Sequence, residues 1–543
     1  MKRVFGKLFM IVMSVAILAT LTTSCSNEKP SSSTPSESSQ GTTAASGEAS
    51  SSSTEPIEIV VFNNSGGYGG AGSEAGSTAE SIKLVQDKIL EATNVKVTSI
   101  IVIGADAQAA KLATLLASNA ELDIWWGNWS DYATDGIIRP INDYLDQYGA
   151  DVYEVWKKWD AWARCTDVDG KIWAVSRYTQ FCSYFPFVRT DWLGNLKMDM
   201  PTTLKQFEDY LYAVKDADFY GNGETIPLIG RGGAVKNSFE WAMLGGFTDA
   251  GCSSWLDENG NVMPKELQKG YKDFIAKLHQ WYKDGIIHKE NFSWDTAKVR
   301  ELVSSGRAGA SMAYYVDVSQ FNHVMQQNFP EASFAHYEKG LKGPNGQLIQ
   351  TLNPGTSKQM LFSAKMSDEK MAAAMKLVNW SFGSWDNFKT CCNGIEGIHW
   401  NYDTSVVDLA SAKKDYVVKA IPNSGYYGDF SLSIGLPYES MGVIYNDDGS
   451  RYTHNLYLAE YLDDFDTCKQ TLDAKITWNK EELKNNIPTL NDIDTFINEE
   501  LVKFVTGDRD LSTWDGFVND VKKLGLDNWS KEYTRQYNLL TGK

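Results

Sequence analysis

Residues 82–103, IKLVQDKILEATNVKVTSIIVI, place a helical pattern directly before a strand pattern. Apolar residues in the first part recur every three or four positions, as on one face of a helix, and a run rich in β-branched residues begins at Val95. Upstream, IEIVVF at 57–62 predicts an earlier strand. A strand, a helix and a second strand in this order are typical of a βαβ unit in a parallel sheet.

The same alternation continues along the chain, with a leucine-rich helical face at 112–116 and an apolar strand at 122–125. In parallel sheets, ligands bind beyond the carboxyl ends of the strands. The loops after Phe62 and after Trp125 are therefore expected to contact ligand. Farther on, Thr203 and Gln206 predict a capping box at the start of another helix.

The first 24 residues predict an export signal. A basic start is followed by the apolar run Leu8–Leu21, then by small residues and Cys25. The run is shorter than the about 20 apolar residues of a membrane span. One interpretation is a plain signal peptide cut near Ser24. The favoured interpretation is a lipoprotein signal with Cys25 lipidated, although Thr22 stands where a lipobox usually has Leu.

Residues 25–55 consist almost entirely of small and polar residues. Such a segment buries too little apolar surface to fold, so we expect a disordered tether behind the lipid anchor. The predicted location is the extracellular face of the cell membrane. From about Pro56 the 543-residue chain is globular to its end, which is too long for one core and predicts two or more domains.

Composition excludes several classes of function. The formal net charge of −18 argues against binding to nucleic acid or to anionic lipid surfaces. The sequence has no GxSxG, HExxH or P-loop motif, and none of its six histidines pairs with another at metal-ligand spacing. Six cysteines other than Cys25 show no CxxC pattern, so we expect mostly free, buried thiols, although an exported protein permits disulfides.

An aromatic cluster follows the strand at 122–125. The segment WWGNWSDY at 125–132 holds three Trp in five residues beside polar side chains. Aromatic faces stack on the apolar faces of sugar rings, and Asn or Asp side chains bond sugar hydroxyls. We predict sugar contacts from Trp126, Asn128, Trp129 and Asp131, against the alternative that these rings are core.

Five segments resemble family 1 of the extracellular solute-binding proteins, in the family's order, and the later ones resemble its larger, LipO-like lipoproteins. They are GKIWAV at 170–175, RTDWL at 189–193 with PTT at 201–203, GRAGASM at 306–312, GIEGIHW at 394–400, and GLD at 525–527 with Tyr533 and Gln536. The resemblance implies an α/β, two-lobed periplasmic-binding-protein fold with a hinge between the lobes and a helical C-terminal part. It implies no enzymatic activity.

The resemblance also implies that the chain crosses between lobes near Tyr178, Gly340 and Asn387. The expected first lobe is 56–178 plus 340–387, and the expected second lobe is 179–339 plus 388–543.

Ligand contacts are likewise implied by resemblance to maltose and alginate-oligosaccharide binders. In maltose binders the loop matching 126–131 contacts sugar, and so does an aromatic after the strand that matches 306–312. We expect the largest share of affinity from stacking on Trp126, Trp129 and Tyr315. The further expected contacts are Asn63, Arg177, Tyr178, Trp241, Tyr314, Asp317 and Trp400.

A metal site is a weaker expectation. Related proteins carry a calcium loop where this chain has residues 216–224, and its oxygen-bearing candidates are Asp218, Asn222 and Glu224. Calcium takes 6–8 oxygen ligands, whereas Tyr220 stands where an Asn or Asp is expected. A polar helix-to-strand turn is the favoured interpretation, and no other cofactor is expected.

The predicted function is capture of a sugar or oligosaccharide by a monomer that delivers it to the permease subunits of an ABC importer. Two alternatives stay open. One is an extracellular polysaccharide hydrolase or lyase, because paired carboxylates of a glycosidase have no sequence signature. The other is a ligand-sensing partner of a membrane receptor.

Overall fold

The fold is given by a computed structural model whose chain separates into Met1–Thr54 and one compact unit, Glu55–Lys543. The predicted signal peptide, Cys25 and the predicted tether up to Thr54 lie outside the described residues. The structure describes residues 55–63, 77–102, 105–118, 120–159, 164–175, 184–314, 317–335, 341–348, 359–402, 418–421, 424–426, 444–445 and 471–543.

The first sheet has five strands in the order β2-β1-β3-β11-β4. They are β1 (Ile57–Asn63), β2 (Val95–Ile101), β3 (Ile124–Gly127), β4 (Ala174–Val175) and β11 (Gln359–Phe362). Strand β1 is parallel to β2 and β3, whereas β11 is antiparallel to β3 and β4. The predicted βαβ unit is confirmed, because α1 (Ala79–Thr93) connects β1 to β2.

Local sequence sets the ends of α1. The Thr78 side chain caps the first turn by accepting a hydrogen bond from the Ser81 backbone N–H. Asn94 ends the helix with φ at 54°, the left-handed conformation that Asn tolerates better than most residues. Val85 and Ile89 are fully buried, as the helical periodicity predicts.

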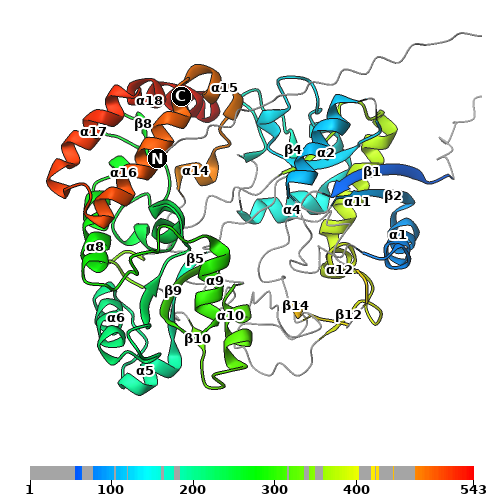
Figure 1. Cartoon of the computed structure of the whole chain (residues 1–543). Helices are drawn as coiled ribbons and strands as arrows, with labels where there is room; N and C mark the ends of the chain where they lie inside the picture. The colour runs from blue at the N-terminus through cyan, green and yellow to red at the C-terminus, as the bar shows by residue number, and fades with distance from the viewer. Residues whose placement is uncertain are drawn as a thin grey trace, which may run out of the picture. The chain divides into compact units, whose positions relative to one another are not determined.

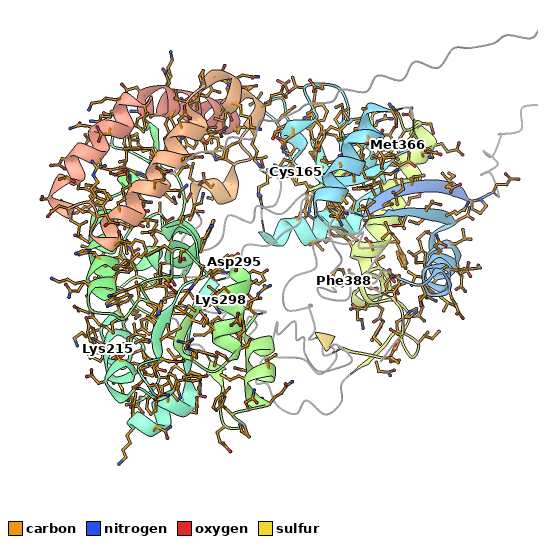
Figure 2. All side chains as sticks on the ribbon, viewed as in Figure 1. Cys165, Lys215, Asp295, Lys298, Met366 and Phe388 are labelled. Atoms are coloured by element: carbon orange, nitrogen blue, oxygen red, sulfur yellow. The ribbon has the colours of Figure 1, made fainter. Side chains whose placement is uncertain are left out.

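Helices cover the first sheet and share its core. They are α2 (Ala105–Ala117), α3 (Asn142–Tyr148), α4 (Ala150–Trp159), α11 (Asp368–Gly383) and α12 (Trp385–Asn393). The core includes Trp125, Trp156, Cys165 and Met366, the last two of which are labelled in Figure 2.

The second sheet has four strands in the order β10-β5-β9-β6. They are β5 (Tyr184–Arg189), β6 (Ile226–Ile229), β9 (Ala308–Tyr314) and β10 (Phe334–Ala335), and β5, β9 and β10 are labelled in Figure 1. Phe185 and Phe187 belong to the core under α9 (Thr296–Ser304) and α10 (Asp317–Gln326), and Val188 belongs to the core on the other face, as alternation along a strand requires. Asp295, labelled in Figure 2, caps α9 by accepting from the Lys298 backbone N–H at 2.8 Å.

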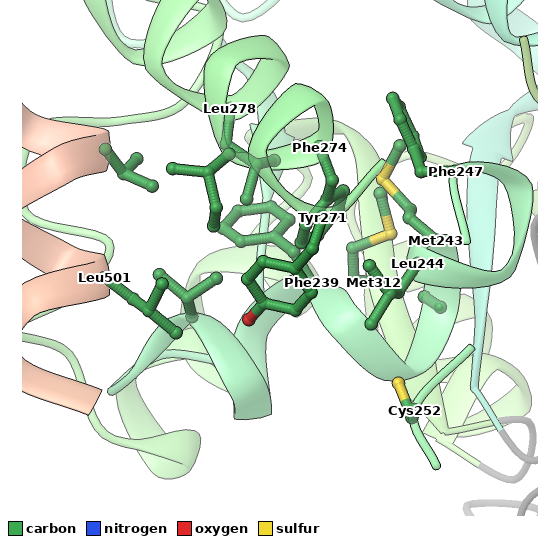
Figure 3. Close-up of a cluster of buried hydrophobic side chains, with 14 of the residues drawn as sticks. Phe239, Met243, Leu244, Phe247, Cys252, Tyr271, Phe274, Leu278, Met312 and Leu501 are labelled. Atoms are coloured by element: carbon green, nitrogen blue, oxygen red, sulfur yellow. The ribbon is translucent and has the colours of Figure 1, made fainter. Parts of the chain in front are cut away.

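The largest core of the second lobe lies around α8 (Tyr271–Lys283). Figure 3 shows Tyr271 and Phe274 of α8 beside Phe239, with Leu501 facing them from α16 (Leu490–Thr506). The helices that complete this core are α6 (Leu204–Ala217), α7 (Trp241–Met243), α17 (Trp514–Lys523) and α18 (Leu526–Thr541). The predicted helical C-terminal part is therefore confirmed, and so is the capping box of Thr203 and Gln206 on α6.

Shorter elements complete the described structure. They are α5 (Thr190–Leu196), β7 (Trp255–Leu256), β8 (Val262–Met263), β12 (Trp400–Tyr402), β13 (Val418–Ala420), β14 (Ile444–Tyr445), α14 (Leu472–Lys475) and α15 (Lys480–Asn486). No helix within the described ranges combines the length and apolarity needed to cross a membrane.

Two predicted lobe boundaries differ from the structure. Leu341 packs in the second core and Lys342 bridges to Thr203, so residues 341–348 do not open the first lobe. Asn387 lies inside α12, and Cys391 after it packs in the first core. Lobe membership follows from which core takes the apolar side chains, and sequence periodicity does not contain that information. The expected crossings near Tyr178 and Gly340 lie outside the described residues.

The described cysteines are buried thiols, as predicted: Cys165, Cys252, Cys391 and Cys392. Burial raises the pKa of the Cys252 thiol well above its ordinary value, so it stays protonated. Cys182 and Cys468 lie outside the described residues.

Candidate functional site

One edge of the second sheet gathers side chains from three separate segments. Because β6 is parallel to β9 and β5 is antiparallel to it, the ends of β6 and β9 lie at the same edge as the start of β5. Tyr184 opens β5 and pairs in register with Tyr314, the last residue of β9. This is the carboxyl-end edge where parallel strands place ligand-binding loops.

Three partly exposed aromatic rings meet at this edge. The ring centroids of Tyr184 and Tyr314 lie 5.3 Å apart at an interplanar angle of 57°. The Tyr184 centroid is also 6.1 Å from that of Trp241, with the planes at 39°. Trp241 and Tyr314 are residues that the resemblance implied, whereas Tyr184 was missed. A sequence signal for Tyr184 is an aromatic residue at the start of a strand. If that strand is antiparallel to one whose carboxyl end binds ligand, its first residue lies at the binding edge.

Arg231 completes this group, which we name the aromatic edge: Tyr184, Trp241, Tyr314 and Arg231. It follows β6 by two residues, and its guanidinium carbon lies 4.6 Å from the centroid of the Tyr184 ring. That distance places the cation within reach of a cation–π attraction.

The turn after β6 needs glycine to hold Arg231 in place. Gly232 adopts φ of 82°, and a Cβ there would approach the Trp294 carbonyl oxygen to 2.3 Å. The Gly233 backbone N–H donates to that same oxygen at 3.0 Å. This hydrogen bond fixes the backbone next to Arg231 against Trp294. The close approach at Gly232 requires glycine, because any Cβ would collide with the Trp294 carbonyl.

A pocket of about 360 Å³ adjoins the aromatic edge through Trp241. Asn128 and Arg164 of the first lobe line it together with second-lobe residues and the segment 473–498. The remaining lining residues include Lys236, Cys252, Ser254, Lys265, Glu266, Asp473, Trp478, Lys480, Asp494, Trp529 and Tyr533. A second pocket of about 440 Å³, with Trp255 and Gln268 on its wall, shares Ser254 with the first.

A buried ionic cluster forms one side of the pocket. The Lys265 ammonium lies 3.2 Å from the Glu240 carboxylate and also pairs with Glu266. The Tyr271 hydroxyl donates to Glu240 at 2.5 Å, and burial together with this carboxylate raises the pKa of the tyrosine well above its ordinary value. The cluster thus holds one ammonium against two carboxylates, and these buried contacts make it a rigid wall.

The acidic group that remains on the wall is Asp494. Desolvation within the pocket raises the pKa of this carboxyl above its ordinary value, although nearby Lys236 acts in the opposite direction. No hydrogen bond or ion pair joins the Asp494 carboxylate to another residue of the described part of the chain.

The aromatic loop predicted to stack on sugar is mostly buried. Trp126 is 4% exposed and Trp129 is 8% exposed, and both belong to the first core. The indole N–H of Trp129 donates to the Arg164 carbonyl at 2.7 Å. Rings this deeply packed offer little face to a ligand, so the structure favours the alternative interpretation of these rings as core.

The polar members of that loop lie differently. Asn128 lines the pocket, and its side-chain amide approaches the Asp131 carboxylate at 3.4 Å. The other carboxylate oxygen of Asp131 is buried, and no described residue donates a hydrogen bond to it. A buried carboxylate oxygen without a donor is costly, but Asp131 is not among the residues that line the pocket.

Several expected contacts lie away from the pocket lining. Asp317 is buried, and its carboxylate accepts from Arg300 at 2.8 Å. Trp400 is 3% exposed, and its indole N–H donates to the Gly394 carbonyl at 2.9 Å. Both side chains are engaged in holding local structure, which leaves them little capacity for a ligand.

The other expected contacts fall at or beyond the edge of the described structure. Asn63 ends β1, at the same sheet edge as the loop of Asn128. Arg177, Tyr178 and Tyr315 lie outside the described residues.

The suspected calcium loop binds its own backbone. The Asp218 carboxylate accepts from the Gly223 N–H at 2.8 Å and from the Thr225 N–H at 3.3 Å, and these bonds lower the pKa of the carboxyl. Glu224 pairs with Arg307 at 3.7 Å. Over the described residues, no group of three His, Cys, Asp or Glu is arranged to hold a metal ion. The loop matches the predicted polar turn.

The family model described as bacterial extracellular solute-binding protein matches residues 72–383. Lipoprotein LipO of Bacillus subtilis (strain 168) is 28% identical over 186 residues, which cover 34% of this chain and 37% of the relative. The polygalacturonan/rhamnogalacturonan-binding protein YtcQ of the same organism is 23% identical over 265 residues, which cover 47% of this chain and 51% of the relative. The matches thus span about half or less of these curated relatives.

A solved structure agrees over nearly the whole molecule. The ABC-transporter substrate-binding protein FusA of S. pneumoniae, in complex with kestose, has a TM-score of 0.57 at 16% identity and covers 90% of this chain and 100% of that chain. At this identity the likeness concerns the fold alone, and it confirms the predicted two-lobed α/β fold.

Proposed function

Since the chain belongs to the bacterial extracellular solute-binding protein family, we propose that it captures an oligosaccharide at the cell surface and delivers it to an ABC importer. The family assignment confirms the resemblance found in the sequence and agrees with a binding protein rather than an enzyme. Relatives of this chain carry names that refer to a lipoprotein and to carbohydrate binding.

The observation that carries the proposal is the pocket with residues of both lobes on its wall. Asn128 comes from the loop after β3, and Trp241 comes from the aromatic edge of the second sheet. Partly exposed rings suit the apolar faces of sugars, and the side-chain amide of Asn128 suits their hydroxyls. The adjoining pocket at Ser254 supports a ligand of more than one sugar ring.

The proposed mechanism makes and breaks no covalent bond. A ligand that contacts groups on both lobes binds more tightly when the lobes close on it, so it shifts the population toward the closed form. The closed form then docks on the permease subunits. Lipidation of Cys25 would hold the protein at the outer face of the membrane, with residues 25–55 as the tether.

The experiment is a panel of purified oligosaccharides tested for binding and for product formation. A ligand at about 100 times its Kd stabilises a protein by about 2.7 kcal/mol, so the melting temperature should rise with at least one member of the panel. Chromatography of the same samples should show the saccharide intact. Release of shorter products would establish the hydrolase or lyase alternative, and the absence of any thermal shift across the panel would contradict sugar capture.

A further inference from the structure

Resting on the proposed function, we propose that the ligand is an acidic oligosaccharide, one that carries carboxylate groups, and that Arg231 binds a carboxylate at the aromatic edge. The inference concerns the chemical class of the sugar and the residue that selects it. It is carried by the contacts of Arg231 and by the charges around the pocket.

The contacts of Arg231 differ from those of Arg139, Arg189 and Arg509. Arg139, Arg189 and Arg509 each hold a carboxylate of this chain, at 2.9, 2.6 and 2.5 Å. The guanidinium of Arg231 lies over the Tyr184 ring and makes no hydrogen bond or ion pair with any described residue. None of its five N–H donors is thus engaged by a described residue, and the side chain is partly buried.

The position of Arg231 matches a sugar that stacks on the neighbouring rings. Tyr184 contacts Trp241 on one side, and Trp241 lines the pocket. Arg231 lies over that same Tyr184 ring, so a chain of sugar rings that follows the aromatic edge from the pocket reaches the guanidinium. A guanidinium binds a carboxylate through two parallel N–H bonds, a geometry that a neutral hydroxymethyl group cannot provide.

Two cationic side chains without an ion-pair partner among the described residues also line the pocket. Lys236 and Lys480 line the pocket, and neither forms an ion pair with a described residue. Of the acidic groups there, Glu266 is paired with Lys265, and Asp473 accepts hydrogen bonds from Ser254 and Trp478.

Counted over the whole lining, four side chains are cationic (Arg164, Lys236, Lys265 and Lys480) and three are acidic (Glu266, Asp473 and Asp494). This holds within a chain of net charge −18, whose overall field would repel an anion.

The test compares saccharides that differ only in their carboxylates. The probes are the trimer and the tetramer of galacturonic acid, those of mannuronic acid, and the same four compounds with each carboxyl reduced to the alcohol. Citrate serves as an anion that is not a sugar. Binding is measured by calorimetry on the full globular unit, with wild type, Arg231→Gln and Arg231→Lys.

Arg307→Gln is the matched control. The Arg307 guanidinium also lies over a tyrosine, Tyr220, at 5.8 Å from the ring centroid, but it pairs with Glu224 at the loop of residues 218–224.

We expect at least one acidic oligomer to bind and its reduced form to bind at least tenfold more weakly. Arg231→Gln should lose at least tenfold for the acidic form only, Arg231→Lys should recover part of that loss, and Arg307→Gln should change nothing.

The possible outcomes distinguish failure of the acidic-ligand inference from failure of the proposed sugar-binding function. Equal binding of acidic and reduced forms, or preference for the reduced form, overturns the acidic ligand and leaves sugar capture intact. Equal loss for both forms in Arg231→Gln overturns the carboxylate role of Arg231. Binding of citrate as tight as that of the sugars overturns the saccharide. Failure of every compound to bind overturns the inference alone, because the thermal shifts of the wider oligosaccharide panel then decide the proposed function.

Discussion

The indole rings of Trp129 and Trp173 lie nearly parallel, at 8°, with their centroids 6.4 Å apart. One face of the Trp129 ring is therefore directed at another ring of the same lobe. Its N–H is held by the Arg164 carbonyl, which also accepts hydrogen bonds from Gln359 and Thr477. The loop after β3 thus carries its tryptophans as packing elements.

The first prediction concerns the stability of this loop. Trp129→Ala should lower the free energy of unfolding by about 3–5 kcal/mol, because truncating a buried tryptophan leaves a cavity. Trp129→Phe should lose less, since it keeps most of the packing and removes the hydrogen bond to Arg164. Urea denaturation followed by circular dichroism measures both. A variant that unfolds like wild type and binds sugar poorly would show instead that Trp129 is a ligand contact.

The second prediction concerns the aromatic edge. Trp241→Ala and Tyr184→Ala should each weaken ligand binding at least tenfold, which is about 1.4 kcal/mol, because both rings are partly exposed beside the pocket. Tyr184→Phe should retain affinity, since stacking uses the ring. Calorimetry gives the affinities, and Tyr220→Ala, at an exposed tyrosine on another loop, is the control. Unchanged affinity in both alanine variants would place the binding site elsewhere.

The third prediction concerns the membrane anchor. Cys25→Ser should release the protein from the membrane fraction into the medium, because the thiol is the proposed site of lipidation. The released protein should bind ligand as tightly as wild type, since the globular unit begins at Glu55. Immunoblotting of membrane and medium fractions follows the distribution. Retention of the variant in the membrane fraction would exclude anchoring through Cys25.

The fourth prediction concerns closure of the lobes. Saturating ligand should reduce the radius of gyration measured by small-angle X-ray scattering, because the ligand favours the form that contacts it from both lobes. Tyr184→Ala at the same ligand concentration should show a smaller average change, in proportion to its lower occupancy. A radius that stays constant at full occupancy would argue against hinge closure.

The fifth prediction concerns pH and the loop of Asp218. Backbone N–H groups lower the pKa of this carboxyl in the folded protein below its unfolded value of about 3.9. A lowered folded pKa contributes stability above the unfolded pKa, and that stability is lost as the pH falls through the folded pKa. Asp218→Asn should therefore be less stable than wild type at pH 7, and the difference should shrink toward pH 3.

Chemical denaturation in the presence of EDTA measures this difference without a contribution from bound cations. A difference that is the same at pH 7 and pH 3 would mean that the carboxylate charge has no part in it. A melting temperature that rises with added calcium in wild type and not in Asp218→Asn would show that the loop takes a metal.

Local features of this protein follow from the sequence by itself. The helix α1 and the strands beside it were predictable because apolar spacing is set by residues within one turn or one pleat. The capping box of Thr203 and Gln206 was predictable because both partners belong to one turn. The resemblance carried by segments 170–175, 306–312 and 394–400 likewise needed no structure.

Only the tertiary structure decided which aromatic rings are available to a ligand. Trp126 and Trp241 are the same residue type beside polar neighbours, yet Trp126 is 4% exposed and Trp241 reaches the pocket. Burial depends on what distant segments pack against a ring, and β11, from more than 200 residues downstream, pairs with β3 and places Met360 opposite Trp126. The role of Arg231 was not predictable for the same reason. Its guanidinium lies over the Tyr184 ring, and the two residues share a sheet edge because β6 is parallel and β5 antiparallel to β9.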